Sequence, residues 1–152
     1  MAELPQNFLE MLDEANSIVT ADYPQAELFE ASINLTLLGA PWQFVFGDPA
    51  TSPASTVILK NFEGQFQTPP QYIDSPWGDD NAIPLPITLD LQEALSLCEQ
   101  KGCGSGNPDY ITLRWPLYPG DTEPFYIVTW VSANQRCFVG VNTQNVQCDA
   151  VN

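Results

Sequence analysis

Few of the residue combinations that perform acid–base and nucleophilic chemistry can be formed by this sequence of 152 residues. It contains no histidine, so Ser-His and Cys-His nucleophilic systems are absent. Its 19 acidic residues form many carboxylate pairs, and no single pair stands out as a general acid and base. The run Asp79-Asp80-Asn81 could offer oxygens to calcium, but its spacing is not that of an EF-hand loop. We therefore expect no enzyme, cofactor or metal ion; an enzyme with paired carboxylates in a sheet cleft is the alternative.

Cysteine is the second residue type that could do chemistry. The four cysteines all lie in the second half of the chain, at Cys98, Cys103, Cys137 and Cys148. They form no CxxC pair, and without histidine a zinc site is not expected. Their spacing favours two local disulfides, 98–103 and 137–148, and hence an oxidising compartment. Four reduced thiols in a cytosolic protein are the alternative.

The net charge of the chain restricts the kinds of partner that it can bind. The chain has 4 basic and 19 acidic residues and a net charge of −15. This balance argues against nucleic acid and against anionic membranes, because both would repel it, whereas a cationic partner would be steered toward it. No apolar run approaches the roughly 18 residues of a membrane span. Met1-Ala2-Glu3 lacks the features of a signal peptide, so the chain is either cytoplasmic or a mature protein that is secreted or periplasmic, which the cysteines favour.

Two segments have the apolar spacing of amphipathic helices, residues 6–21 and residues 91–101. Before the second, Asp90 and Glu93 have the form of a capping box, and Gly102 is placed to end it. Other segments alternate between apolar and polar residues, as strands do when a helix covers one face of their sheet. The covered face is predicted to comprise Phe29, Ala31, Ile33, Leu35, Leu37, Ile111, Leu113, Trp115 and Leu117, together with two aromatic-rich trios, Trp42, Phe44 and Phe46, and Tyr126, Val128 and Trp130.

The order of these segments occurs twice. Leu12-Asp13-Glu14-Ala15 recurs as Leu91-Gln92-Glu93-Ala94, and the following strands recur at offsets from 79 to 84 residues. A repeat of this length indicates two similar supersecondary units that share a surface. Residues 1–67 would form the first unit, residues 68–86 a proline-rich linker and residues 87–152 the second unit. We predict an α+β fold of two tandem helix-plus-four-strand units, with one extended sheet that can be concave and helices on one face.

The last segment of the chain resembles part of a known family of modules. Val139-Gly140-Val141-Asn142-Thr143-Gln144-Asn145-Val146 is similar to the hairpin that ends PepSY-type modules, and Tyr23-Pro24-Gln25-Ala26-Glu27 resembles their helix-to-strand link. Two such units in tandem resemble the architecture of the secreted beta-lactamase inhibitor proteins, where two α/β repeats form a concave sheet that grips an enzyme. The resemblance implies a protein-binding function and carries over no inhibitory residue.

The predicted function follows from these features. We expect a non-enzymatic protein that binds another protein through the sheet face opposite the helices, and the resemblance implies that this binding inhibits an enzyme. That face is predicted to carry Glu30, Ser32, Asn34, Thr36, Tyr110, Thr112, Arg114, Phe125, Ile127 and Thr129. The alternative is a carbohydrate-binding module that uses the Trp77/Asp79 loop and Tyr72, because aromatic rings stack on sugars. The face could also be solvated, or covered by the linker or by a second copy of the chain.

Overall fold

The fold was obtained as a computed structural model, which describes residues 4–5, 7–77, 81–104, 106–115 and 122–151. A helix precedes four strands, and a second helix precedes four more. The elements are α1 (Phe8–Asp22), β1 (Glu27–Asn34), β2 (Trp42–Asp48), β3 (Ser55–Phe62), β4 (Gln65–Ile73), α2 (Leu91–Gln100), β5 (Tyr110–Arg114), β6 (Phe125–Trp130), β7 (Gln135–Gly140) and β8 (Val146–Ala150).

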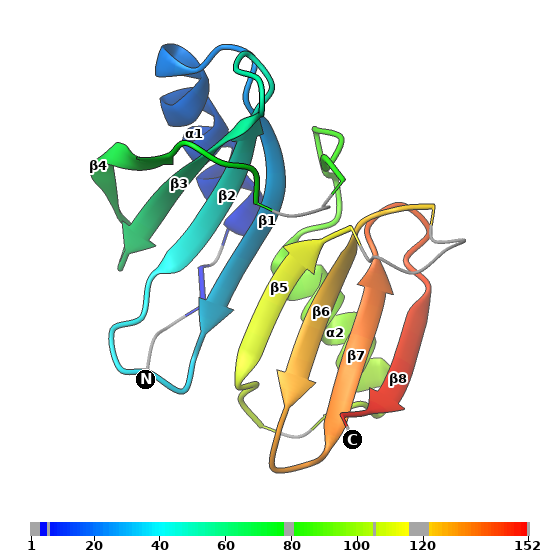
Figure 1. The fold of residues 1–152 in the computed structure, drawn as a ribbon. Helices are drawn as coiled ribbons and strands as arrows, with labels where there is room; N and C mark the ends of the chain where they lie inside the picture. Colours follow the sequence, from blue (N-terminus) through cyan, green and yellow to red (C-terminus); the bar gives the residue numbers. More distant parts are fainter. Residues whose placement is uncertain (1–3, 6, 78–80, 105, 116–121, 152) are drawn as a thin grey trace.

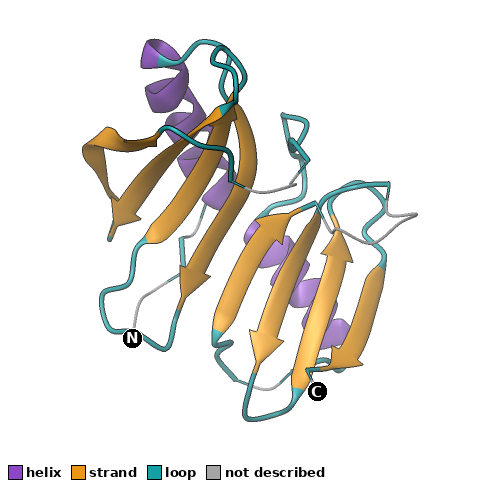
Figure 2. Cartoon of the chain, in the orientation of Figure 1, coloured by secondary structure: helices purple, strands orange, loops and turns teal. Residues whose placement is uncertain are grey.

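The eight strands form one antiparallel sheet in the order β4-β3-β2-β1-β5-β6-β7-β8. Its centre is the pairing of β1 with β5, in which Ser32 lies opposite Thr112. Both helices lie on the same face of the sheet, as Figures 1 and 2 show. This confirms the predicted α+β class and the extended sheet with helices on one side.

Both helices begin where the sequence places capping residues. The side chain of Asn7 accepts a hydrogen bond from the Glu10 N–H at the start of α1. At the start of α2, Asp90 and Glu93 form the predicted capping box. Gly102 has a φ of +79° just after α2, a conformation that glycine adopts without steric cost. There the Cys103 N–H donates to the Cys98 carbonyl over 3.0 Å, which closes the helix end.

The core lies between the helices and the sheet. Phe8 of α1 packs on Trp42 of β2 with 4.7 Å between ring centroids, and both side chains are buried. Tyr126 of β6 is fully buried and donates its hydroxyl to the Leu89 carbonyl over 2.7 Å. Burial raises the pKa of this phenol, and the negative charges of nearby Asp90 and Glu93 raise it further. The two trios predicted to face the core are all buried.

Two predicted core positions, Phe29 and Leu37, are wrong. The register of β1 against β2 shifts between Leu28 and Glu30, so Phe29 occupies a bulge. The extra residue reverses the alternation, and Leu28 enters the core instead. The Phe29 ring lies over Gly47, where a β-carbon would come within 2.3 Å of the ring. Strand β1 also ends at Asn34, which leaves Leu37 exposed in the turn that follows.

The first part of the predicted linker is a strand. β4 continues to Ile73 and includes Pro69 and Pro70. Proline lacks the N–H that a central strand needs, but β4 is the edge of the sheet and one side of its backbone has no neighbouring strand. Residues 68–73 of the predicted linker therefore belong to β4.

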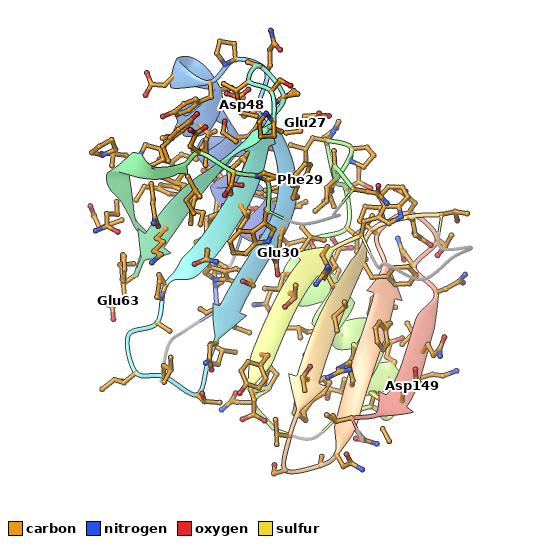
Figure 3. All side chains as sticks on the ribbon, in the orientation of Figure 1. Glu27, Phe29, Glu30, Asp48, Glu63 and Asp149 are labelled. Atoms are coloured by element: carbon orange, nitrogen blue, oxygen red, sulfur yellow. A yellow bond between two sulfur atoms is a disulfide. The ribbon has the colours of Figure 1, made fainter. Side chains whose placement is uncertain are left out.

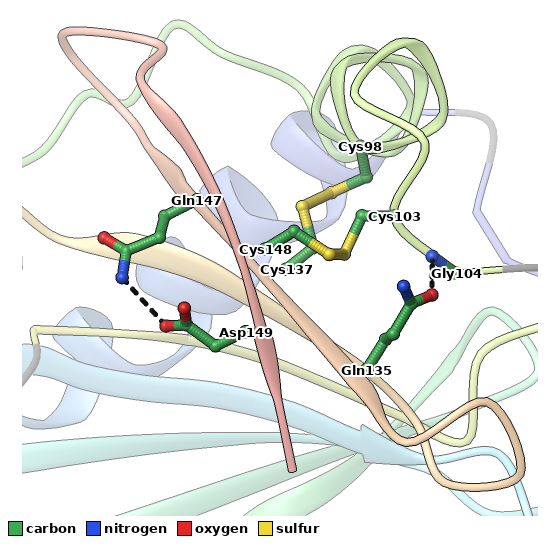
Figure 4. The surroundings of a disulfide bond; sticks show 8 residues. All are labelled: Cys98, Cys103, Gly104, Gln135, Cys137, Gln147, Cys148 and Asp149. Atoms are coloured by element: carbon green, nitrogen blue, oxygen red, sulfur yellow. Dashed lines mark hydrogen bonds between the residues drawn. A yellow bond between two sulfur atoms is a disulfide. The ribbon is translucent and has the colours of Figure 1, made fainter.

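The disulfides differ from the predicted pairs. Cys98 is bonded to Cys137 and Cys103 to Cys148, with Cα–Cα distances of 6.1 and 5.7 Å (Figure 4). Cys137 and Cys148 do lie opposite each other across the hairpin, as expected, but each bonds a cysteine at the end of α2. The reason is packing: Cys98 is on the buried face of α2, which rests on β7. The two disulfides thus attach the last turn of α2 and the segment after it to β7 and β8, and they indicate an oxidising compartment.

Candidate binding face of the sheet

The candidate site is the sheet face turned away from the helices, called the open face below. Strand alternation places a row of side chains on it, in which Ser32, Thr112, Ile127 and Phe138 lie opposite one another on neighbouring strands. A second row contains Glu30, Arg114 and Phe125, and a third contains Asn34, Tyr110, Thr129 and Arg136.

A groove of about 600 Å³ crosses the open face over β5, β6 and β7. Six of its lining residues were predicted to lie on the binding face: Glu30, Tyr110, Thr112, Arg114, Ile127 and Thr129. Four were missed: Val131, Arg136, Phe138 and Val151. Arg136 and Phe138 could have been found, because they alternate with Cys137 and Val139 in a strand next to β6.

The groove has an apolar floor between two arginines. Ile127 and Phe138 lie side by side on β6 and β7. Arg114 on β5 and Arg136 on β7 stand at diagonal positions on either side of Ile127, two strands and four residues apart in register. At usual strand spacing their Cα atoms are about 16 Å apart. Tyr110 and Val131, both exposed, lie at the Arg136 end.

The other predicted binding residues lie outside the groove. Ser32 and Asn34 are on β1, where the Asn34 side chain accepts a hydrogen bond from the Thr36 N–H over 3.0 Å. Phe125 packs edge-on against Phe138 at 6.5 Å between centroids. Tyr72 faces the helix side, where it stacks on Tyr23 at the end of α1. Asp79 lies outside the described residues.

Thr129 is on the predicted face but is buried rather than solvated. Its side chain is 7% exposed, and its hydroxyl accepts a hydrogen bond from Arg136 Nε over 3.4 Å. Truncating Thr129 would therefore leave Arg136 without this hydrogen-bond partner.

The segment after β4, residues 74–77, is called the strap below. It crosses the open face above β3 and β2, as Figure 1 shows. The Thr56 hydroxyl donates to the Ser75 carbonyl over 2.7 Å, and Trp77 Nε1 donates to Glu30 Oε2 over 3.2 Å. In this part of the open face Val45 is fully buried. The first half of the open face, formed by β1 to β4, is thus covered in the region that the strap crosses. The groove lies over the second half, formed by β5 to β8.

Phe29 and Glu30 lie at the boundary between these halves, as Figure 3 shows. Glu30 pairs in register with Arg114 of β5 and holds Trp77 of the strap. Trp77 is 38% exposed, so part of its ring can still meet a ligand beside the groove. The predicted aromatic loop and the predicted sheet face are therefore neighbours and not separate sites.

The positive charge of the chain is concentrated on the open face. Of the four basic residues in the sequence, Lys60, Arg114 and Arg136 lie there, whereas Lys101 follows α2. Lys60 lines a smaller hollow of about 280 Å³ near the β3–β4 edge. In a chain of net charge −15, the remaining surface is consequently strongly acidic.

Glu123 is a buried carboxylate close to the groove strands. Its oxygens accept hydrogen bonds from the Asn142 and Thr143 N–H groups and from the Thr143 hydroxyl, over 2.8, 3.0 and 2.6 Å. Burial by itself raises the pKa of this carboxyl, but the three hydrogen bonds outweigh it and lower the pKa below 4.5. Because the carboxylate is fully used in holding the β7–β8 turn, we assign it a structural role.

Comparison with known proteins gives a fold and no activity. No family model and no curated protein sequence matches the chain. A crystal structure of a protein from Clostridium difficile 630, described as a "putative lipoprotein", is similar with a TM-score of 0.66. The two sequences are 13% identical, and the likeness covers 95% of this chain and 99% of that chain. An identity this low shows a shared fold alone.

Among the described residues, no helix is long and apolar enough to cross a membrane. Within the same residues, no three His, Cys, Asp or Glu side chains are grouped as metal ligands.

Proposed function

We propose that this chain is a non-enzymatic binding protein that recognises another protein through the groove on its open face. The observation that carries the proposal is the groove itself: Tyr110, Arg114 and Arg136 surround an apolar floor. Tyrosine and arginine around a desolvated apolar centre are the residues that supply most binding energy in protein interfaces. Inhibition of an enzyme partner is the form of this function that the PepSY-like and inhibitor-like resemblance implies.

A shallow, open groove suits a protein better than a small molecule. Small ligands are usually enclosed by their site, whereas this groove spans three strands and is continuous with the exposed side chains of Tyr110 and Val131. The acidic balance of the chain also leaves nucleic acid and anionic membranes as unfavourable partners.

We further propose that the two halves are copies of one helix-plus-four-strand unit. At an offset of 79, the buried residues Leu12, Ala15 and Val19 of α1 correspond to Leu91, Ala94 and Cys98 of α2. By register, Cys137 lies opposite Val128 as Leu59 lies opposite Phe44. The Cys98–Cys137 disulfide would then occupy the place of an apolar pair in the first half.

A secreted or envelope location is the corresponding proposal for the site of action. Two disulfides support it, because such bonds persist in oxidising compartments. The description of the structurally similar protein is compatible with it.

Site-specific photocrosslinking tests the proposed function. A photoreactive phenylalanine at Thr112, on the open face, would be compared with one at Gln92, on the exposed side of α2. We expect extracellular or envelope extract of the source organism to give a discrete protein adduct from Thr112 and none from Gln92, and Tyr110→Ala to weaken that adduct more than tenfold. Equal adducts at both positions would refute the proposed face.

The hydrogen bond from Trp77 to Glu30 favours carbohydrate as the second candidate, because it puts an exposed indole beside the groove. In that case a glycan array would give a specific hit that Trp77→Ala abolishes. Crosslinking at Thr112 would then give no discrete protein adduct.

A further inference from the structure

We infer that the groove accepts an acidic, apolar element of the partner: an aromatic side chain on Ile127 and Phe138, with a carboxylate beside it that pairs with Arg136. The inference rests on the proposed function and specifies the chemistry of the partner at the same site.

The floor defines where the apolar group lies. Ile127 and Phe138 are adjacent across the β6–β7 pair and are half-buried, so part of each side chain remains open to a ligand. Phe125 supports Phe138 from the side through an edge-on ring contact. An aromatic ring laid on this floor would remove apolar surface of both partners from water, and aromatic pairs favour such offset or edge-on contacts.

The charges around the floor define what accompanies the ring. The lining contains two guanidinium groups, Arg114 and Arg136, and one carboxylate, Glu30, while the carboxylate of Asp149 lies outside the lining, on β8 opposite Arg136. The lining itself therefore carries net positive charge within an acidic chain. Glu30 is already held by Trp77 at the strap end of the groove. A cationic partner group would therefore meet like charge near the floor, whereas a carboxylate would meet arginine.

Arg136 is the better placed arginine. Its Nε donates to the Thr129 hydroxyl over 3.4 Å, which orients the side chain across β6. Its cross-strand neighbour on β8 is Asp149, and the Oδ2 atom of that residue accepts a hydrogen bond from the Gln147 amide over 2.8 Å. A guanidinium has five N–H donors, so it can bind a carboxylate through two of them while Nε keeps its bond to Thr129.

The net charge of −15 does not prevent this pairing. At physiological salt the Debye length is about 8 Å, so charges on the far side of the molecule act weakly at the groove. Salt screens the contact between a partly buried arginine and a carboxylate less strongly. The charges around the groove therefore decide whether it prefers an anionic or a cationic partner group.

The test uses small probes on the isotopically labelled full-length protein, followed by NMR. N-acetyl-L-phenylalanine carries both the ring and the carboxylate, N-acetyl-L-phenylalanine amide lacks the charge, and acetate lacks the ring. A ligand of this size is expected to bind with a dissociation constant on the order of 1 mM. We expect the acid to shift the amide signals of Ile127, Arg136 and Phe138, to bind at least threefold more tightly than the amide, and acetate to shift them little.

Three substitutions complete the test. Arg136→Gln should bring the acid down to the affinity of the amide, whereas Lys60→Gln, a change of the same kind elsewhere on the open face, should leave the difference unchanged. Phe138→Ala should weaken both ring-bearing probes. A spectrum with unchanged dispersion establishes that each variant is folded.

The outcomes separate this inference from the proposed function. Equal affinity for acid and amide, shifts that map outside the groove, or no shift at about 20 mM probe, well above the expected 1 mM scale, would each overturn the inference. If the Thr112 crosslink to a protein nevertheless forms, the binding face stands and only the stated partner chemistry is wrong. If both experiments fail, the proposed function fails as well.

Discussion

Gly104 gives the sharpest stability test of this structure, because its surroundings leave no room for a side chain. Its φ is +81°, and an added β-carbon would lie 2.3 Å from atoms of the Trp130 ring. The ring is only 5% exposed, and its Nε1 donates to the Gly106 carbonyl over 3.1 Å, so it cannot move aside freely. Gly102, two residues earlier, has nearly the same φ of +79°, but no atom lies within 4 Å of the place its β-carbon would take. The pair therefore separates backbone strain from steric conflict.

We expect Gly102→Ala to reduce the free energy of unfolding by about 1–2 kcal/mol, the usual cost of a left-handed residue with a β-carbon. Gly104→Ala should lose that amount and about 1–3 kcal/mol more, the cost of overpacking a core. Urea unfolding monitored by tryptophan fluorescence, with the disulfides intact, measures both values. In a Trp130→Leu background the extra loss should largely disappear. Equal losses for the two alanine variants, or an extra loss that persists without the indole, would refute this description of the Trp130 contact.

Three further predictions follow from the core, the disulfides and the buried carboxylate. Trp42→Ala should lower the free energy of unfolding by about 3–5 kcal/mol because the ring is buried on Phe8. Gln43→Ala, on the open face, should lower it by less than about 1 kcal/mol. Similar losses for the two variants would mean that the two residues do not face opposite sides of β2, as the structure has them. Non-reducing peptide mapping should find the Cys103–Cys148 bond, which closes 45 residues and contributes roughly 4 kcal/mol by chain entropy; detection of the local 98–103 pair would contradict the fold of this region. Glu123→Gln should destabilise the protein at pH 7. Because the pKa of Glu123 is lowered in the folded state, this loss of stability should shrink as the pH falls from about 4.5 through the folded-state pKa. A loss of stability that does not depend on pH would exclude the charge of Glu123 as its cause.

Much of the fold could be predicted because local rules decide it. Helical spacing and the Asp90–Glu93 capping box predict α2 to within one residue of its observed end, since these signals act within a few positions of the chain. The period-two alternation likewise predicted Ile111 and Leu113 as core residues of β5. The alternation failed at Phe29, because a bulge adds one residue without leaving a mark in the pattern.

The binding face could be predicted in part for the same reason. Alternation by itself assigns Thr112, Arg114 and Ile127 to one side of the sheet, whichever strands are neighbours. It does not say which stretch of that side is covered. The strap covers part of the first half and leaves the groove over the second, and this depends on contacts such as that of Trp77 with Glu30, 47 residues apart.

The sequence by itself determined the helices and most strand faces, because each is a property of neighbouring residues. Only the tertiary structure decided that β1 pairs with β5, that the groove lies over the second half of the open face, and that Cys98 bonds Cys137 and not Cys103. The physical reason is the same in all three cases. Disulfide partners and groove walls are set by how α2 and the strands pack together, over separations such as the 39 residues between Cys98 and Cys137, where residue spacing along the chain holds no record of distance in space.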